Sequence, residues 1–321
     1  MKRTLLLICT LLCANVLLAQ EQLAVLKHND STSVFYGQSA FEQAYTAATH
    51  GDIITLSDGI FSTPSQIKKG ITVRGNGAVA DTARKSTGTY FMENFTVYEL
   101  GDSLQFSAEG IYFDRLTTTY SYDIKLTRCA VRYIINAYGA QMTDCIILSN
   151  GADGNSSRQN TFINCVVKDL PNYSICNNCI LTGKTISSGD GYCTSQYNNC
   201  ILINSTTNSD TINLYQTANN SILCRWDTIP NYTSTGNVSM NISDVFENWD
   251  GATFTLDPET YKLKTTVSDT IVGLDGTEVG IFGGFMPFEW RPSYSIIKRF
   301  NVANRTTADG KLSVDIEVIS E

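Results

Sequence analysis

The chain has little histidine. Its 321 residues include only His28 and His50, and both come before the repeated part of the sequence. The serine and cysteine nucleophiles of the common hydrolases need an imidazole base beside them. A Ser-His-Asp or Cys-His site is therefore excluded from the repeats.

The chain also lacks a surplus of positive charge and, after its first residues, any long apolar run. Its formal net charge is -8, whereas nucleic-acid binding needs basic patches that face the phosphates, so we expect no nucleic-acid partner. Residues 1–19 begin with Met1-Lys2-Arg3 and continue with a short apolar run, which predicts a cleaved signal peptide. Nothing later is long enough to span a membrane, so we expect a secreted, periplasmic or cell-surface protein.

What the sequence does contain is a repeated short motif. A polar residue, a cysteine or serine, and two apolar residues recur in six segments. The segments are TRCAV at 127–131, TDCII at 143–147, INCVV at 163–167, NNCIL at 177–181 and at 198–202, and NNSIL at 219–223. A unit of this size cannot bury its own apolar face, so the copies must stack on one another.

The repeat gives most cysteines a packing role. Two of the ten cysteines lie in the predicted signal peptide, which leaves eight in an exported chain, where disulfides would be expected. Cysteines one rung apart lie about 4.8 Å from each other with parallel Cβ directions, whereas a disulfide needs Cβ atoms that face each other. We therefore predict a ladder of buried thiols at Cys129, Cys145, Cys165, Cys179 and Cys200. The disulfide candidates are Cys176, Cys193 and Cys224.

The neighbours of the cysteine raise two further expectations. The residue before it is most often asparagine, which tolerates the left-handed backbone of a sharp bend and can hydrogen-bond from rung to rung. After it come two apolar rows, although adjacent strand residues point to opposite faces. The rows are Ile146, Val166, Ile180, Ile201 and Ile222, and Ile147, Val167, Leu181, Leu202 and Leu223. Either a local bend changes the alternation, or one row lies outside and is covered by a loop, the terminal segment or a partner, including a second copy of the chain.

The segment before the repeats points to a known fold. Residues 38–49 carry apolar side chains at helical spacing, and residues 51–61 and 71–77 alternate as short strands. The succession GD-x-I-x-L-x-x-G-x-F and IKKGITVRGNG resembles the opening of right-handed parallel β-helix proteins of the pectin-lyase-like fold. The resemblance implies an all-β architecture in which the helix caps the first rung and residues 20–285 form one right-handed parallel β-helix.

The pattern changes towards the C terminus. The run from Gly276 to Gly284 resembles the closing segment of secreted β-helix proteins of Bacteroidetes, and the resemblance implies that it finishes the last rungs. Pro287 and Pro292 break any continuation. Residues 286–321 are predicted to form a C-terminal β segment, with two strands around Asp309-Gly310 as a hairpin.

Charged residues support one enzymatic hypothesis. Polysaccharide lyases on this fold use a Lys or Arg base beside carboxylates that bind calcium or neutralise a uronate. The catalytic candidates are Arg132, Asp144, Lys168 and Asp169, whose convergence on one groove would recruit an acidic sugar. Arg128 and Asp144 occupy equivalent repeat positions and could form a structural ion pair. We expect no metal or other cofactor unless the chain is a calcium-dependent lyase. The CxxC pair Cys176 and Cys179 resembles half of a zinc site, but Cys179 already belongs to the predicted cysteine ladder.

Aromatic residues support a second hypothesis. Exposed rings stack on sugar faces, whereas covered rings pack over rung edges. The ligand-binding candidates are Tyr133, Tyr138, Tyr173 and Trp226. We expect a secreted glycan-binding or cell-surface structural module, with a lyase acting on an acidic glycan as the alternative. A binding module predicts an aromatic outer strip, whereas a lyase predicts a groove where carboxylates and a Lys or Arg converge.

Overall fold

The computed structural model describes most of the chain from residue 22 onward. The described residues are 22–84, 86–101, 104–119, 124–149, 159–168, 173–183, 195–204, 217–224, 235–251, 253–291, 296–302, 309–311 and 314–319. The predicted signal peptide, Asp169, Cys193 and Trp226 lie outside these ranges. No helix of the described part is long and apolar enough to cross a membrane.

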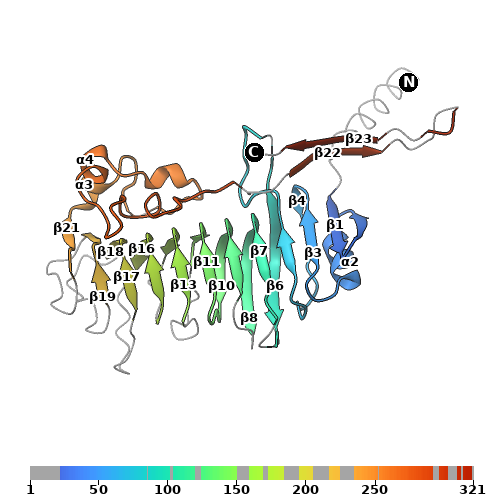
Figure 1. The fold of residues 1–321 in the computed structure, drawn as a ribbon, viewed down its shortest axis with the longest axis horizontal. Coiled ribbons are helices and arrows are strands. Elements are labelled where there is room, and N and C mark those ends of the chain that lie inside the picture. Colours follow the sequence, from blue (N-terminus) through green and yellow to red (C-terminus); the bar gives the residue numbers. More distant parts are fainter. Residues whose placement is uncertain are drawn as a thin grey trace, which may run out of the picture.

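Two long sheets run side by side along the molecule (Figure 1). Sheet A contains β1 (Leu23–His28), β2 (Ser31–Tyr36), β3 (Ile53–Leu56), β5 (Thr72–Arg74), β7 (Ser107–Glu109), β9 (Lys125–Thr127), β11 (Gln141–Thr143), β13 (Thr161–Ile163), β15 (Ile175–Asn177), β17 (Gln196–Asn198) and β19 (Thr217–Asn219). Sheet B contains β4 (Gly59–Ile60), β6 (Thr89–Tyr98), β8 (Tyr112–Thr119), β10 (Ala130–Ile135), β12 (Ile146–Ile147), β14 (Val166–Lys168), β16 (Ile180–Gly183), β18 (Ile201–Asn204), β20 (Ile222–Cys224) and β21 (Val238–Met240). From β3 onward, successive rungs pair in parallel within each sheet. The prediction of a parallel β-helix is confirmed.

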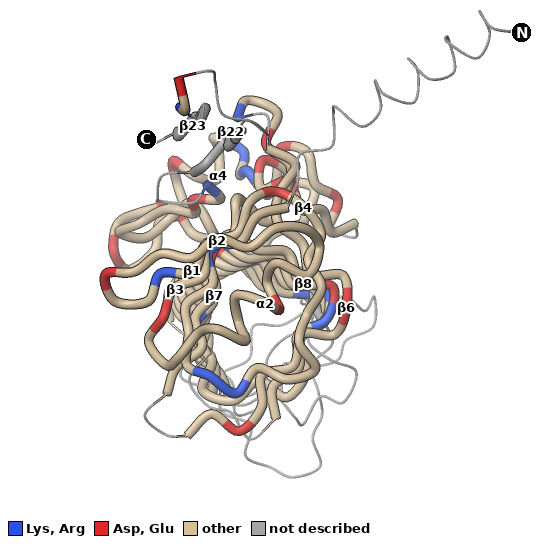
Figure 2. The backbone as a smooth tube through the Cα atoms, turned by 90° about the vertical axis from the view of Figure 1, so that its right-hand side faces the viewer, with Lys and Arg blue, Asp and Glu red and all other residues tan. Residues whose placement is uncertain are grey.

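The N-terminal end of the stack is closed by β1, β2 and the helix α2 (Ala40–Ala47). The helix buries Phe41, whose ring lies 4.9 Å from that of Phe91. The Lys69 ammonium donates to the Tyr45 and Ala48 carbonyls at the end of the helix, at 2.6 and 2.8 Å, where a positive charge is favourable. Viewed along the stack, α2 lies across its end (Figure 2). The predicted capping helix is confirmed.

The residue before each repeat cysteine or serine forms a bend from sheet A to sheet B. These residues are Arg128, Asp144, Asn164, Asn178, Asn199 and Asn220, and their φ angles are 54, 53, 51, 54, 55 and 47°. The predicted left-handed bends are therefore confirmed. We call these six residues the bend row.

The rung-to-rung amide ladder lies one residue earlier than the bend row. Asn198 Nδ2 donates to Asn177 Oδ1, and Asn219 Nδ2 donates to Asn198 Oδ1, both at 3.0 Å. Assigning this ladder to the bend asparagines was wrong. The bend asparagines Asn164 and Asn199 hydrogen-bond instead to the C-terminal part of the chain, whereas the last residue of each sheet A strand stands in register with its neighbours.

The cysteine ladder is confirmed. All five of its members are fully buried, and each thiol lies near a backbone carbonyl, such as Cys145 Sγ at 3.2 Å from Thr143 O. Ser221 continues the column, and its hydroxyl donates to Asn219 O at 2.8 Å. The disulfide prediction for Cys176 is wrong, because this free thiol is an inward residue of β15 that pairs in register with Phe162 and Tyr197. Cys224 is buried on β20.

The two apolar rows face opposite sides of sheet B. The row beginning with Ile147 belongs to the core between the sheets. The row beginning with Ile146 lies on the outer face and forms a second core with residues from the C-terminal part of the chain. That part includes α3 (Ile242–Val245), the 3-10 helix η1 (Pro258–Tyr261) and α4 (Thr265–Ser268). All five outer-row residues are 0% exposed, so the outer row is no exposed surface for self-association.

Residues 271–291, which we call the closing strap, run back across the bend row. Leu274 N donates to Asn199 Oδ1 at 2.9 Å, and Asn164 Nδ2 donates to Ile281 O at 2.7 Å. Further on, Arg128 Nε donates to Glu289 O at 3.1 Å. The expectation that the run from Gly276 to Gly284 finishes the last rungs is therefore wrong, because this run lies on earlier rungs instead of extending the stack.

Beyond the strap, β22 (Ile296–Val302) and β23 (Val314–Ile319) pair antiparallel. The predicted C-terminal hairpin is confirmed.

Candidate functional site

Two of the charged candidates from the sequence, Arg132 and Lys168, lie on the outer face of sheet B. Arg132 is 51% exposed on β10 and pairs with Asp114 at 2.9 Å. Lys168 is exposed at the end of β14. The register places Leu148 between them in the same outward row, so their backbones are two strand spacings apart, or about 10 Å.

Asp144 lies instead in the bend row, beneath the closing strap. It is 5% exposed, and its Oδ2 lies 4.0 Å from Arg128 Nε. Burial raises the pKa of Asp144 to about 7, because the lost hydration outweighs the attraction of Arg128 and the Glu289 N–H, and the Glu289 carboxylate adds repulsion. No contact joins Asp144 to Arg132 or Lys168 among the described residues. The proposed catalytic set stays a prediction.

The tyrosine candidates are also dispersed. Tyr133 is half-buried on β10, where the guanidinium groups of Arg132 and Arg115 lie 5.1 and 5.8 Å from its ring centre. Tyr90 and Tyr112 stand beside each other on β6 and β8 with ring centres 5.6 Å apart. We call Tyr90, Tyr112 and Tyr133 the tyrosine strip. The role of Tyr133 in ligand binding stays a prediction.

Tyr138 and Tyr173, the other two described tyrosine candidates, lie outside the strands of this strip. Tyr138 follows β10, and Tyr173 precedes β15 with a φ of 50°. Both are half-buried. Their roles as ligand-binding residues stay predictions.

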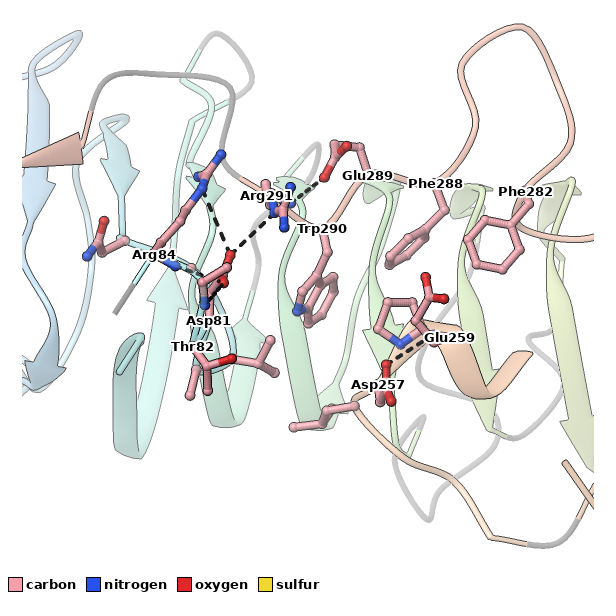
Figure 3. A pocket seen from close by; sticks show the side chains of 17 residues that line it. Asp81, Thr82, Arg84, Asp257, Glu259, Phe282, Phe288, Glu289, Trp290 and Arg291 are labelled. Carbon is pink, nitrogen blue, oxygen red and sulfur yellow. Dashed lines mark hydrogen bonds and ion pairs between the residues drawn. The ribbon is translucent and has the colours of Figure 1, made fainter. Parts of the chain in front are cut away.

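A cleft that the sequence did not reveal lies between the closing strap, η1 and the loop that follows β5 (Figure 3). Its volume is about 780 Å³. One wall is the loop 76–84 between β5 and β6, and the others come from residues 256–259 around η1 and from the closing strap. Segments some 200 residues apart thus meet here, so no single stretch of the sequence contains the site.

A partly buried polar network around Asp58 fixes the loop wall. Asp58 Oδ1 accepts from Asn76 Nδ2 at 2.6 Å and from Ser86 Oγ at 2.7 Å, while Asp58 Oδ2 accepts from Thr87 N at 3.0 Å. One carboxylate therefore holds both ends of the loop to the preceding rung. Charge-assisted hydrogen bonds of this kind favour a preformed wall.

The strap wall is aromatic. The rings of Phe288 and Trp290 are stacked, with centres 5.5 Å apart and an angle of 21° between their planes. Phe282 meets Phe288 edge-on at 6.4 Å. Phe288 is 8% exposed, whereas Trp290 is half-buried and offers more of its surface to the cleft. The aromatic pair separated by one residue, F-E-W at 288–290, is the signal that could have drawn attention to this segment.

Acidic groups dominate the rim. Asp81 accepts from Arg291 Nε at 3.3 Å across the cleft and from Ala83 N at 2.9 Å, and Arg84 lies 3.9 Å away. The lining contains four carboxylates and two guanidinium groups, so its formal charge is -2; these residues are Asp81, Asp257, Glu259, Glu289, Arg84 and Arg291. Such a rim accepts hydrogen bonds from hydroxyl groups and disfavours a polyanion.

Metal ligation has no evident place in the described part of the chain. No group of three or more His, Cys, Asp or Glu residues there is arranged to hold an ion. The CxxC residues Cys176 and Cys179 lie inside the core between the sheets. The calcium that a lyase would use therefore has no supporting geometry among these residues.

Comparison with known proteins gives no family. No protein-family model matches the chain, and no curated protein matches it.

Proposed function

We propose that this chain is a glycan-binding β-helix protein and that the cleft between the loop 76–84 and the closing strap is its binding site. The observation that carries the proposal is the stacked pair Phe288 and Trp290 on the wall of a cleft with a polar rim. Mostly preformed clefts with an aromatic wall and a few polar groups are where small ligands and sugars bind. A sugar face would lie on Trp290, and its hydroxyls would donate to the rim carboxylates.

The charge of the rim favours an uncharged glycan. Asp257 and Glu289 are exposed carboxylates without a guanidinium partner among the described residues. One oxygen of each accepts a backbone N–H, from Glu259 at 3.1 Å and from Arg291 at 2.8 Å, and the other oxygen could accept a hydroxyl hydrogen. A uronate would instead meet a lining of net negative charge. The preformed loop wall, held by Asp58, limits the ordering needed on binding.

The lyase alternative has less support. A lyase needs a base and a cationic group beside the same sugar. Arg132 is engaged by Asp114 on an exposed strand, while Asp144 is buried beneath the strap. The apolar run of the first residues supports export as the setting in which a glycan would be met.

A glycan panel tests the proposal. Uncharged, amino and uronate oligosaccharides would be presented to the wild-type protein and to Trp290→Ala, Trp290→Phe and Tyr133→Ala variants. We expect binding to an uncharged glycan that falls at least about tenfold in Trp290→Ala, is largely kept in Trp290→Phe, and is unchanged in Tyr133→Ala. Loss in Tyr133→Ala alone would move the site to the tyrosine strip. Binding to no glycan, or release of an unsaturated product from a uronate polymer, would overturn the proposal.

A further inference from the structure

The closing strap lies along the bend row as along a track, and one of the bend residues beneath it is an ionisable aspartate in place of an asparagine. Asn164 and Asn199 meet the strap with neutral amides, which hydrogen-bond to it at Ile281 O and Leu274 N. At the next earlier rung the track residue is Asp144. An aspartate there has the same bend geometry as the asparagines but can carry a charge.

The surroundings of Asp144 suit its neutral form. Its Oδ1 is buried and has no hydrogen-bond partner among the described residues. Three charged groups face the site: Arg128 from the preceding bend, Glu289 from the strap, and Glu109 from β7, which lies behind Arg128. Glu109 takes the shorter ion pair with Arg128, at 3.0 Å against 4.0 Å for Asp144. The Glu289 N–H of the strap and the shared Arg128 compensate a charge on Asp144 only in part, because the carboxyl is buried away from water.

From this geometry we infer that Asp144 is a proton-operated latch: strap residues 288–291 stay docked on the bend row while the buried carboxyl is neutral, and its ionisation releases them towards solvent. The same strap residues form the aromatic wall of the cleft. Protonation of Asp144 thus keeps the wall in place, and its loss weakens ligand binding. This last step rests on the proposed function, whereas the latch itself does not.

The direction of the pH dependence follows from burial. Burial raises the pKa of Asp144 to about 7 while the strap is docked, and the carboxyl would return towards its usual range once the strap lifts and water enters. Between these two values the docked state holds a proton that the open state releases. Raising the pH through this interval therefore favours the open state, and above about pH 7 the effect levels off.

Hydrogen exchange of the strap tests the latch. Exchange in peptides covering 279–291 would be followed from about pH 5.5 to about pH 8.5 and corrected for the intrinsic pH dependence of amide exchange. We expect protection in the wild-type protein to fall at least about tenfold over this range, and protection in Asp144→Asn to stay constant. Asn is the right replacement because it occupies the equivalent bends with the same positive φ.

A reciprocal variant provides the matched control. Asn178 is 6% exposed beneath Gly283 and Gly284 of the strap, and its Nδ2 has no hydrogen-bond partner among the described residues. Asn178→Asp in an Asp144→Asn background should restore a pH-dependent release, now centred on residues 280–284. Circular dichroism at each pH would verify that the stack itself stays folded.

The outcomes separate the latch from the proposed function. If wild-type strap protection does not change with pH, or if Asp144→Asn keeps the wild-type dependence, the latch is refuted whatever binds in the cleft. If the latch is observed and the affinity for a cleft glycan falls with pH in the wild type but not in Asp144→Asn, both stand. If the latch is observed and no glycan binds, the proposed function alone fails.

Discussion

The outer apolar row should contribute to stability as much as the inner core does, and a pair of adjacent substitutions can show this. Ile201 and Leu202 follow one another on β18 and point to opposite faces of sheet B. They are 0% and 2% exposed. On the strap side, Gly280 packs against Ile201, since a Cβ at Gly280 would lie 3.0 Å from Ile201 Cδ1.

Because both side chains are buried in packed clusters, Ile201→Ala and Leu202→Ala should each lower the free energy of unfolding by about 2–4 kcal/mol. An exposed residue at position 201 would lose no more than about 0.5 kcal/mol. The two variants should differ in where the structure loosens. Ile201→Ala should speed hydrogen exchange across the C-terminal cover, residues 242–291, whereas Leu202→Ala should speed it in the strands.

Urea denaturation followed by tryptophan fluorescence would give the free energies, and exchange mass spectrometry would give the location. A loss in Ile201→Ala of less than about 0.5 kcal/mol would refute the reasoning, because it would mean that the C-terminal part does not cover the row in solution.

Three further predictions concern other parts of the molecule. Burial alone would raise the pKa of Asp52, but hydrogen bonds from the Thr49 N–H and the His28 ring hold this pKa below its usual value. The stability that Asp52 contributes is therefore present above the unfolded pKa and is lost as the pH falls through the folded pKa. Thermal melts of Asp52→Asn should accordingly show a smaller acid-side decline in stability than those of the wild type. Gly283→Ala should lower the free energy of strap opening, measured by hydrogen exchange, by at least about 2 kcal/mol, because the new Cβ would lie 1.7 Å from Glu278 O. In the control Gly276→Ala the new Cβ points into open space, so only the positive φ should cost stability, by about 1 kcal/mol. Burial raises the pKa of Cys165 well above its usual value, so mass mapping after thiol labelling of the native protein should find it unmodified, and rapid modification would contradict the buried ladder.

The sequence could predict the features that each rung repeats. The capping helix, the left-handed bends and the cysteine ladder were all deducible, because each depends on a local preference or on a spacing that recurs. The amide ladder was misplaced by one residue, because both asparagines of N-N-C satisfy the same local preferences and only the register between strands distinguishes Asn177 from Asn178.

The cover and the cleft could not be deduced in the same way. Strand alternation shows that Ile201 and Leu202 face opposite sides, but it does not identify what covers the outer side. That information lies in long-range contacts, such as Asn164 with Ile281 and Arg291 with Asp81. The cleft depends on the same contacts, so its aromatic wall becomes a candidate site only when the strap is seen lying on the bend row.

The central claim is that a glycan binds between the loop 76–84 and the closing strap. The most direct measurement is hydrogen exchange of the full chain with and without the best uncharged oligosaccharide from the panel. Ligand-dependent protection is expected mainly in residues 76–84 and 282–291. Protection on β8 and β10 around the tyrosine strip, with none at the strap, would contradict it.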